Sequence, residues 1–481
     1  MKPADGPPLA VTAHYREFVP ADGAVLDVIA TVNGPEPAGN VGHEGLAEVI
    51  LLDTSGSMGA PQAKMHAALR ASIAAIDALP DGVAFAVVAG TGTATMVFPE
   101  EVRLAVADGR NRAAARHALQ SVSPHGGTAI GSWLLLARQL LATRPDAIGH
   151  AILLTDGRNE SQHPDNLRAA VQECEGYLTI DCRAIGSADG VHDWDAAELL
   201  GIAEALGANP VVPVEDLAGL GDEFRTVLAR AMARRVANAR LRIRTTELAR
   251  VRYVKQVHPA IADLTKRGEP AGELTTGYPI GAWSPQDRRD YHLGLEVDPL
   301  AAGTRRRIGW LSVDTDTGGA PVEVPLTVEW TDDVLRHSEI HPSVAFYTVQ
   351  QDYAVAFHNG LAAAREDRVT EAEDQLGRAV ALAHAAGKDA DVRRIARIVD
   401  VHDAAAGLVR LKVGVDWRLA ESSRVVVHTT TRWGAAADER RPPAPAARVA
   451  PWSHCGERQI GAYCQVCGAA HGTGAAAPER R

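Results

Sequence analysis

The sequence has no long uninterrupted apolar run, although 46% of its 481 residues are hydrophobic. Its most apolar helix-like stretch, Leu134 to Ala142, is interrupted by Arg138 and Gln139 and is far shorter than the ~18 residues of a membrane span. Residues 1–18 contain no apolar core of the length that a secretion signal needs. We therefore expect a globular, cytoplasmic protein that does not bind membranes.

Cysteine and lysine are also scarce. Only five cysteines are present, which fits a compartment where thiols stay reduced. Cys174 and Cys182 lie far from the other three and are interpreted as buried core thiols. Lysine supplies 6 of the 49 basic residues, which we read as compositional bias. The net charge of -11 repels phosphate backbones, so nucleic acid is not the expected partner.

The common catalytic motifs are missing as well. The chain contains no Walker lysine loop, no GxSxG elbow, no HExxH and no Cys–His pair in a recognisable frame. We therefore expect a binding protein rather than an enzyme.

Apolar runs and helix-like stretches alternate between residues 46 and 236. Short runs such as Val49 to Leu52 and Ala151 to Leu154 are apolar on both faces, which is typical of parallel strands covered by helices. The expected helices are Gln62 to Leu79, Ile130 to Thr143, Asp195 to Leu206 and Leu217 to Val236. The predicted fold class is an α/β domain with a doubly wound parallel sheet.

The flanking regions show other patterns. Residues 1–45 and 237–335 carry strand-like alternation, which predicts one β-sandwich domain interrupted by the α/β domain. Residues 340–413 are expected to be helical, with helices at Val344–Arg365, Thr370–Ala386 and Asp389–Leu408. Residues 434–451 form a Pro/Ala linker, and residues 452–471 form a small cysteine-bearing tail.

Oxygen-bearing side chains follow two strands of the α/β domain. Asp53, Ser55 and Ser57 come directly after the first strand, and Asp156 follows the strand ending at Leu154. Thr128 lies in a His-Gly-Gly-Thr loop before a helix. The carboxyl ends of parallel strands meet at one sheet edge, where ligands bind. Oxygen donors suit a hard divalent cation. Alone, Asp-Thr-Ser-Gly-Ser is also compatible with a helix cap.

Together these segments resemble the metal-ion-dependent adhesion site of von Willebrand factor A domains. The resemblance covers roughly residues 47–235 and implies a Rossmann-like fold. It implies that Asp53, Ser55, Ser57, Thr128 and Asp156 hold Mg²⁺ or Mn²⁺. It further implies that an Asp or Glu of a protein partner completes the coordination of the ion. His125, Arg158 and Glu160 lie beside these residues without an assigned role.

The resemblance favours a cytoplasmic interaction protein, for example in a signalling or stress-response complex. Two alternatives stay open. One is an adaptor for a chaperone-like or chelatase-like ATPase, and the other is a metal-dependent phosphohydrolase.

The tail resembles a degenerate zinc ribbon. Cys464 and Cys467 form one complete Cys-x-x-Cys knuckle. The other knuckle is incomplete, because Trp452 stands three positions before Cys455, where its partner cysteine is needed. Three thiolates could hold Zn²⁺ weakly, with His454 or His471 as a further ligand. A decayed ribbon without zinc is the alternative.

Overall fold

The computed structural model describes residues 9–35, 45–60, 62–155, 159–185, 196–207, 211–214, 217–315, 321–434, 452–454 and 457–459. Residues 1–432 form one compact unit and residues 433–481 form another. Within the described ranges, each helix is too short or too polar to cross a lipid bilayer.

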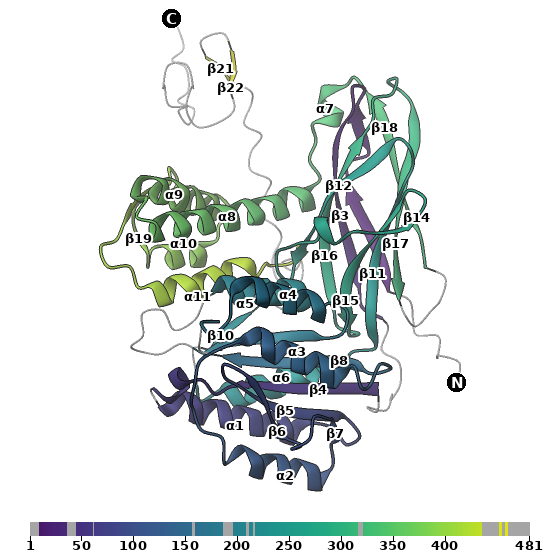
Figure 1. Ribbon diagram of the computed structural model, residues 1–481. Helices are drawn as coiled ribbons and strands as arrows, with labels where there is room; N and C mark the ends of the chain where they lie inside the picture. Colours follow the sequence, from purple (N-terminus) through teal and green to yellow (C-terminus); the bar gives the residue numbers. More distant parts are fainter. Residues whose placement is uncertain are drawn as a thin grey trace, which may run out of the picture. The chain divides into compact units, whose positions relative to one another are not determined.

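A mostly parallel sheet forms the centre of the α/β domain (Figure 1). Its strands are β4 (Leu46–Asp53), β5 (Ala84–Gly90), β6 (Ala94–Phe98), β7 (Ala105–Val106), β8 (Ile148–Thr155), β9 (Thr179–Ile185) and β10 (Val212–Val214). The order is β10-β9-β8-β4-β5-β6, with β7 beside β5, and β6 and β7 are the antiparallel members. Every residue of β4 and β5 is buried, as strands covered on both faces require.

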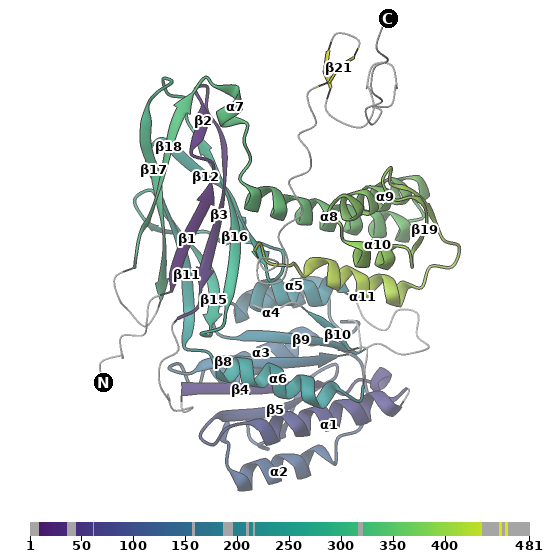
Figure 2. The ribbon, with the colours of Figure 1, turned by 180° about the vertical axis from the view of Figure 1, so that it is seen from behind.

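Helices cover both faces of this sheet. One face packs against α1 (Gln62–Ala78), α2 (Gly109–Leu119) and α6 (Leu220–Met232), which lie towards the viewer in Figure 2. The other face packs against α3 (Ile130–Leu141), α4 (Pro164–Cys174) and α5 (Ala196–Leu206). The predicted α/β fold class is therefore confirmed. Cys174 and Cys182 are buried in the second core with free thiols, as expected.

Two further sheets pack face to face around a third core. One contains β1 (Ala10–Tyr15), β3 (Ala24–Asn33), β16 (Arg288–Val297), β12 (Ala249–His258) and β13 (Ala262–Asp263). The other contains β14 (Glu269–Gly272), β15 (Thr275–Trp283), β11 (Val236–Thr245), β17 (Arg305–Thr315), β18 (Val324–Thr331) and β2 (Phe18–Pro20). Because β3 pairs with β16 over its whole length, strands on either side of the α/β domain in sequence share one sheet.

The C-terminal part of the first unit contains helices and one small hairpin. The elements are α7 (Val334–His337), α8 (Pro342–Arg365), α9 (Val369–Ala385), α10 (Asp389–Ile395), β19 (Val399–Asp403), β20 (Leu408–Leu411) and α11 (Trp417–His428). The predicted helix Asp389–Leu408 is therefore wrong beyond Ile395, and α11 was not predicted.

Local chemistry explains the hairpin. Asp403 accepts a hydrogen bond from the Ala406 backbone N–H (3.0 Å), and Gly407 has a φ of +66°, a conformation that favours glycine. The Gly407 backbone packs so closely on Gly377 of α9 that a Cβ on Gly377 would lie 2.1 Å from the Gly407 carbonyl oxygen. The Ala-rich sequence 404–406 resembles helix, but this turn and contact decide the local structure.

The described part of the second unit contains two short strands. Strand β21 (Trp452–His454) pairs antiparallel with β22 (Glu457–Gln459).

Three ionisable side chains lie within the central sheet near the amino ends of its strands. His150 of β8 contacts Glu48 of β4 through Nδ1 (2.7 Å) and Asp181 of β9 through Nε2 (3.0 Å), and all three are buried. Burial alone lowers the pKa of His150, but the two carboxylates outweigh it and raise that pKa above its usual value. Burial raises the pKa of Asp181, but His150, Arg183 and Arg234 outweigh it and hold that pKa well below its usual range.

The packing of Gly90 on Trp133 generates a stability prediction. A Cβ on Gly90 would lie 2.3 Å from two ring carbons of the fully buried Trp133. Gly90→Ala should therefore destabilise the protein by about 1–3 kcal/mol. Gly109→Ala is the matched control, because nothing lies within 4 Å of its added Cβ at the start of α2. Thermal unfolding in which both variants melt like the wild type would contradict this packing.

The buried His150 cluster predicts a pH-dependent stability. Since the pKa of His150 is raised on folding, its contribution is complete below about pH 6.5 and is lost as pH rises through the folded value. Asp181, whose pKa is lowered, contributes above about pH 4. The melting-temperature gap between wild type and His150→Gln should therefore be larger at pH 5.5 than at pH 8.5. Exposed His117→Gln is the control, and a gap independent of pH would refute the assignment.

Candidate functional site

Asp53 stands at the carboxyl end of the central strand β4, with its side chain buried. Its Oδ1 accepts a hydrogen bond from the Ser55 backbone N–H (2.8 Å), and its Oδ2 accepts one from the Thr155 hydroxyl at the end of β8 (2.5 Å). These two bonds fix the orientation of the carboxylate. They also offset part of the cost of burying it.

Two serine hydroxyls lie beside Asp53. Ser55 precedes the short 3-10 helix η2 (Gly56–Gly59), and Ser57 lies within it. The Ser55 and Ser57 hydroxyls are hydrogen-bonded to each other, with their Oγ atoms 3.0 Å apart. Oxygen ligands at right angles on Mg²⁺, each about 2.1 Å from the ion, stand about 3.0 Å apart. The hydroxyl pair therefore has the spacing of two adjacent ligands of a magnesium ion.

Backbone hydrogen bonds tie the Asp53–Ser57 loop to the loop that carries Thr128. The Gly56 N–H donates to the Gly126 carbonyl (3.0 Å), and the His125 N–H donates to the Thr54 carbonyl (2.8 Å). The structure thus brings Thr128 to the same sheet edge as Asp53. Gly126 has a φ of +70°, which explains a glycine in this loop.

Ser161 holds the backbone of Thr128 from the other side. The Thr128 N–H donates to Ser161 Oγ (3.1 Å), and the Ser161 N–H donates to the Thr128 carbonyl (2.9 Å). A Cβ at position 127 would lie 2.0 Å from the same Ser161 oxygen, so Gly127 is needed for this approach.

The loop of residues 159–162, which contains Ser161, also caps α3. Helix α3 begins after Ala129, which has no side-chain acceptor for the first N–H groups of the helix. Asn159 Oδ1 accepts from the Ile130 N–H (2.9 Å), and Gln162 Oε1 accepts from the Gly131 N–H (2.9 Å). Residues 159–162 therefore fix both Thr128 and the start of the helix behind it.

The structure places four of the five predicted metal-binding residues at one edge: Asp53, Ser55, Ser57 and Thr128. Asp156, like Arg158, lies outside the described residues. His125 is exposed, with Nδ1 2.9 Å from the Ser123 carbonyl, and Glu160 is exposed. Among the described residues, no group of three or more His, Cys, Asp and Glu side chains could hold a metal. The described oxygen donors at this edge are therefore one carboxylate, that of Asp53, and the hydroxyl groups of Ser55, Ser57 and Thr128.

The predicted zinc ligands Cys455, Cys464 and Cys467 also lie outside the described residues, so zinc binding stays a prediction.

Sequence reasoning did not identify Asn159, Ser161 and Gln162 as residues that shape the site. The sequence feature that could have indicated them is the run of hydrogen-bonding side chains shortly after Thr155-Asp156-Gly157. Their partners, Thr128 to Gly131, lie about 30 positions earlier, and that pairing follows from the fold alone.

Comparison with known proteins agrees with this fold. Residues 47–209 match the family model described as von Willebrand factor type A domain. The chain is 38% identical to a solved von Willebrand factor type A protein from Catenulispora acidiphila, with a TM-score of 0.81, covering 89% of this chain and 98% of that one. A search of curated proteins finds no match.

A more distant structure shares the fold. The ArnB paralog VWA2 from Sulfolobus acidocaldarius is 12% identical, with a TM-score of 0.53, covering 86% of this chain and 96% of that one. The sheet topology, the family match and the high coverage of the Catenulispora protein lead to one conclusion: the chain belongs to the von Willebrand factor type A family.

Proposed function

We propose that the protein binds one Mg²⁺ or Mn²⁺ ion through Asp53, Ser55, Ser57, Thr128 and Asp156, and that the ion holds a carboxylate of a protein partner. The observation that carries this proposal is the oriented Asp53 carboxylate beside two hydroxyl oxygens 3.0 Å apart. Hard oxygen donors with this spacing fit a magnesium ion.

The donor set indicates what a bound ion would do. Ser55, Ser57 and Thr128 are neutral, and two carboxylates at most would approach the ion. It would therefore keep positive charge and attract an anionic oxygen, and an Asp or Glu side chain of a partner supplies one. This chemistry is binding rather than catalysis, so we propose an interaction protein and not an enzyme.

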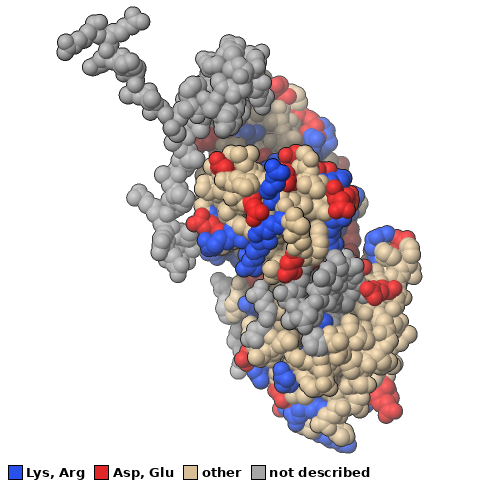
Figure 3. All heavy atoms as spheres, turned by 90° about the vertical axis from the view of Figure 1, so that its left-hand side faces the viewer, with Lys and Arg blue, Asp and Glu red and all other residues tan. Residues whose placement is uncertain are grey.

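The surroundings of the loops suit such a contact. Gly56, Ser57, His125 and Gly126 are exposed at this edge, so a partner side chain can approach. Figure 3 shows the described lower part of one face of the molecule, where uncharged surface is interspersed with Lys, Arg, Asp and Glu side chains.

Metal titration tests the site. In calorimetry on the full chain, Mg²⁺ or Mn²⁺ should bind once to the wild type and not measurably to Asp53→Ala, because the charge that anchors the ion is lost. Thr128→Ala should weaken binding less, since water can replace a neutral ligand. Asp81→Ala, a mostly exposed carboxylate paired with Arg112, should bind like the wild type. Equal binding by wild type and Asp53→Ala would contradict the assignment.

Capture of partners tests the role of the ion. Proteins retained by the immobilised wild type in Mg²⁺ should be released by a chelator, retained again when Mg²⁺ returns, and absent from Asp53→Ala. Replacing one Asp or Glu of such a partner by Ala should weaken binding more than tenfold, because a charged contact with a partly desolvated ion is lost. Partners that resist the chelator but disappear when residues 341–413 are deleted would place the interaction elsewhere.

A further inference from the structure

Glu198, near the start of α5, contacts Asn159 in the loop of residues 159–162. This loop supports Thr128 at the proposed metal-binding edge of the sheet, which we call the metal edge. Glu198 Oε2 accepts a hydrogen bond from the Asn159 backbone N–H (3.0 Å). Asn159 is buried, and its own side chain caps the Ile130 N–H. One carboxylate of α5 is therefore linked through a single residue to the start of α3, two positions after Thr128.

The other end of α5 is held by the β-sandwich. Glu204 Oε1 accepts from the Asp263 N–H (2.7 Å). Arg267 donates to the Glu204 carbonyl (3.1 Å) and the Ala205 carbonyl (2.9 Å). These carbonyls belong to the last turn of the helix, where no intrahelical donor remains. The sandwich thus caps α5 and fixes its carboxyl end.

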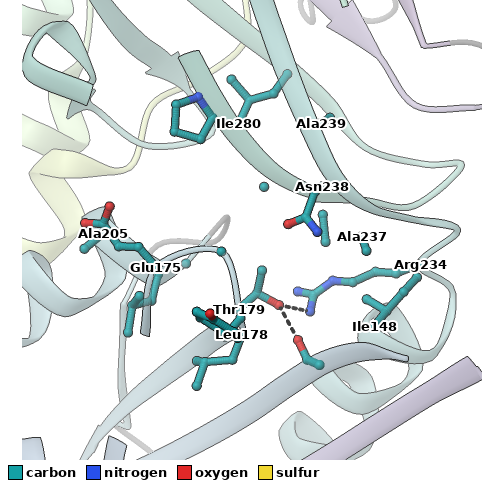
Figure 4. Close-up of a pocket in the computed structure, with 18 of the residues that line it drawn as sticks. Ile148, Glu175, Leu178, Thr179, Ala205, Arg234, Ala237, Asn238, Ala239 and Ile280 are labelled. Carbon is teal, nitrogen blue, oxygen red and sulfur yellow. Dashed lines mark hydrogen bonds between the residues drawn. The ribbon is translucent and has the colours of Figure 1, made fainter. Parts of the chain in front are cut away.

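A cavity of about 1200 Å³ lies beside this contact and is lined by Glu204, Ala205 and Arg267 among others. Figure 4 shows Glu175, Leu178 and Thr179 of the α/β domain on one side of the space, and Asn238 and Ile280 of the sandwich on the other. Side chains do not fill the space between the α/β domain and the sandwich at this cavity. The polar contacts of Glu204 and Arg267 therefore carry a larger share of holding α5 to the sandwich than they would in a packed interface.

We infer that α5 is a positioning element for the metal-binding loops, with Glu198 as its contact at the metal edge and Arg267 as its anchor in the sandwich. An 11-residue helix spans about 16 Å and is stiff, so a shift at its carboxyl end moves Glu198. When Glu198 loses its hold on Asn159, the Thr128 loop loses part of its fixed geometry, and metal affinity falls. This inference rests on the proposed metal site.

The first test is Mn²⁺ titration of full-length variants. Glu198→Ala should weaken Mn²⁺ binding about tenfold, because the acceptor of the Asn159 N–H hydrogen bond is removed. Glu198→Gln keeps the acceptor and should stay within about twofold of the wild type. Arg267→Ala should weaken binding about threefold. Arg240→Ala is the matched control, since Arg240 also lines the cavity but pairs with Glu269 of the sandwich.

The second test needs no metal. Hydrogen exchange of the metal-free protein should be faster at the amides of Thr128, Ile130 and Gly131 in Glu198→Ala and Arg267→Ala, and unchanged in Glu198→Gln and Arg240→Ala. This readout tests the positioning even if Mn²⁺ fails to bind the wild type, a failure that would instead refute the proposed function.

Three results would overturn the inference. The first is that both Glu198→Ala and Arg267→Ala bind Mn²⁺ and exchange their amide hydrogens just as the wild type does. The second is equal weakening by Arg267→Ala and Arg240→Ala, which would indicate general loosening of the joint. The third is Glu198→Gln behaving like Glu198→Ala, because the effect would then not depend on the accepted hydrogen bond. If Glu198→Ala does not fold, the inference is decided by comparing Mn²⁺ affinity and amide exchange in Arg267→Ala with those in Arg240→Ala.

Discussion

The orientation of the Asp53 carboxylate is the constraint on which the proposed metal site depends. The side chain is buried at the end of β4 and is held by one hydrogen bond from its own loop and one from Thr155 on the neighbouring strand. Strand β4 pairs in parallel with β8, so both strands end at the same edge and the second bond can form. Without that register, Asp53 would be a buried carboxylate with fewer partners, which is costly.

The two edges of the central sheet carry different groups of side chains. The carboxyl ends of the strands carry the oxygen donors and their exposed loops. The amino ends carry the buried Glu48–His150–Asp181 cluster and face the joint with the sandwich. At that joint the Arg235 N–H donates to the Trp283 carbonyl (2.8 Å), directly before the chain enters β11. This contact lies at the sheet edge opposite to the one where Asp53 ends β4.

Much of the fold could be predicted from the sequence, because each signal was local. Buried parallel strands appear as continuous apolar runs, and the Asp-x-Ser-x-Ser segment follows one of them directly. The hairpin at 399–411 was not predictable in this way, since its glycine contact with Gly377 is set by tertiary packing. The support of Thr128 by Ser161, and of Asn159 by Glu198, likewise joins residues more than 30 positions apart. Such pairs follow from strand order and helix placement rather than from any one segment.

The most direct test of the metal-dependent account is a crystal structure of the full chain grown with Mn²⁺, with anomalous scattering recorded to locate the ion. The account predicts one strong anomalous peak about 2.1 Å from the Ser55 and Ser57 hydroxyl oxygens, close to Thr128 and the Asp53 carboxylate. A second carboxylate should approach it from Asp156. An anomalous map with no peak at this edge, or with its only peak elsewhere on the chain, would contradict the account.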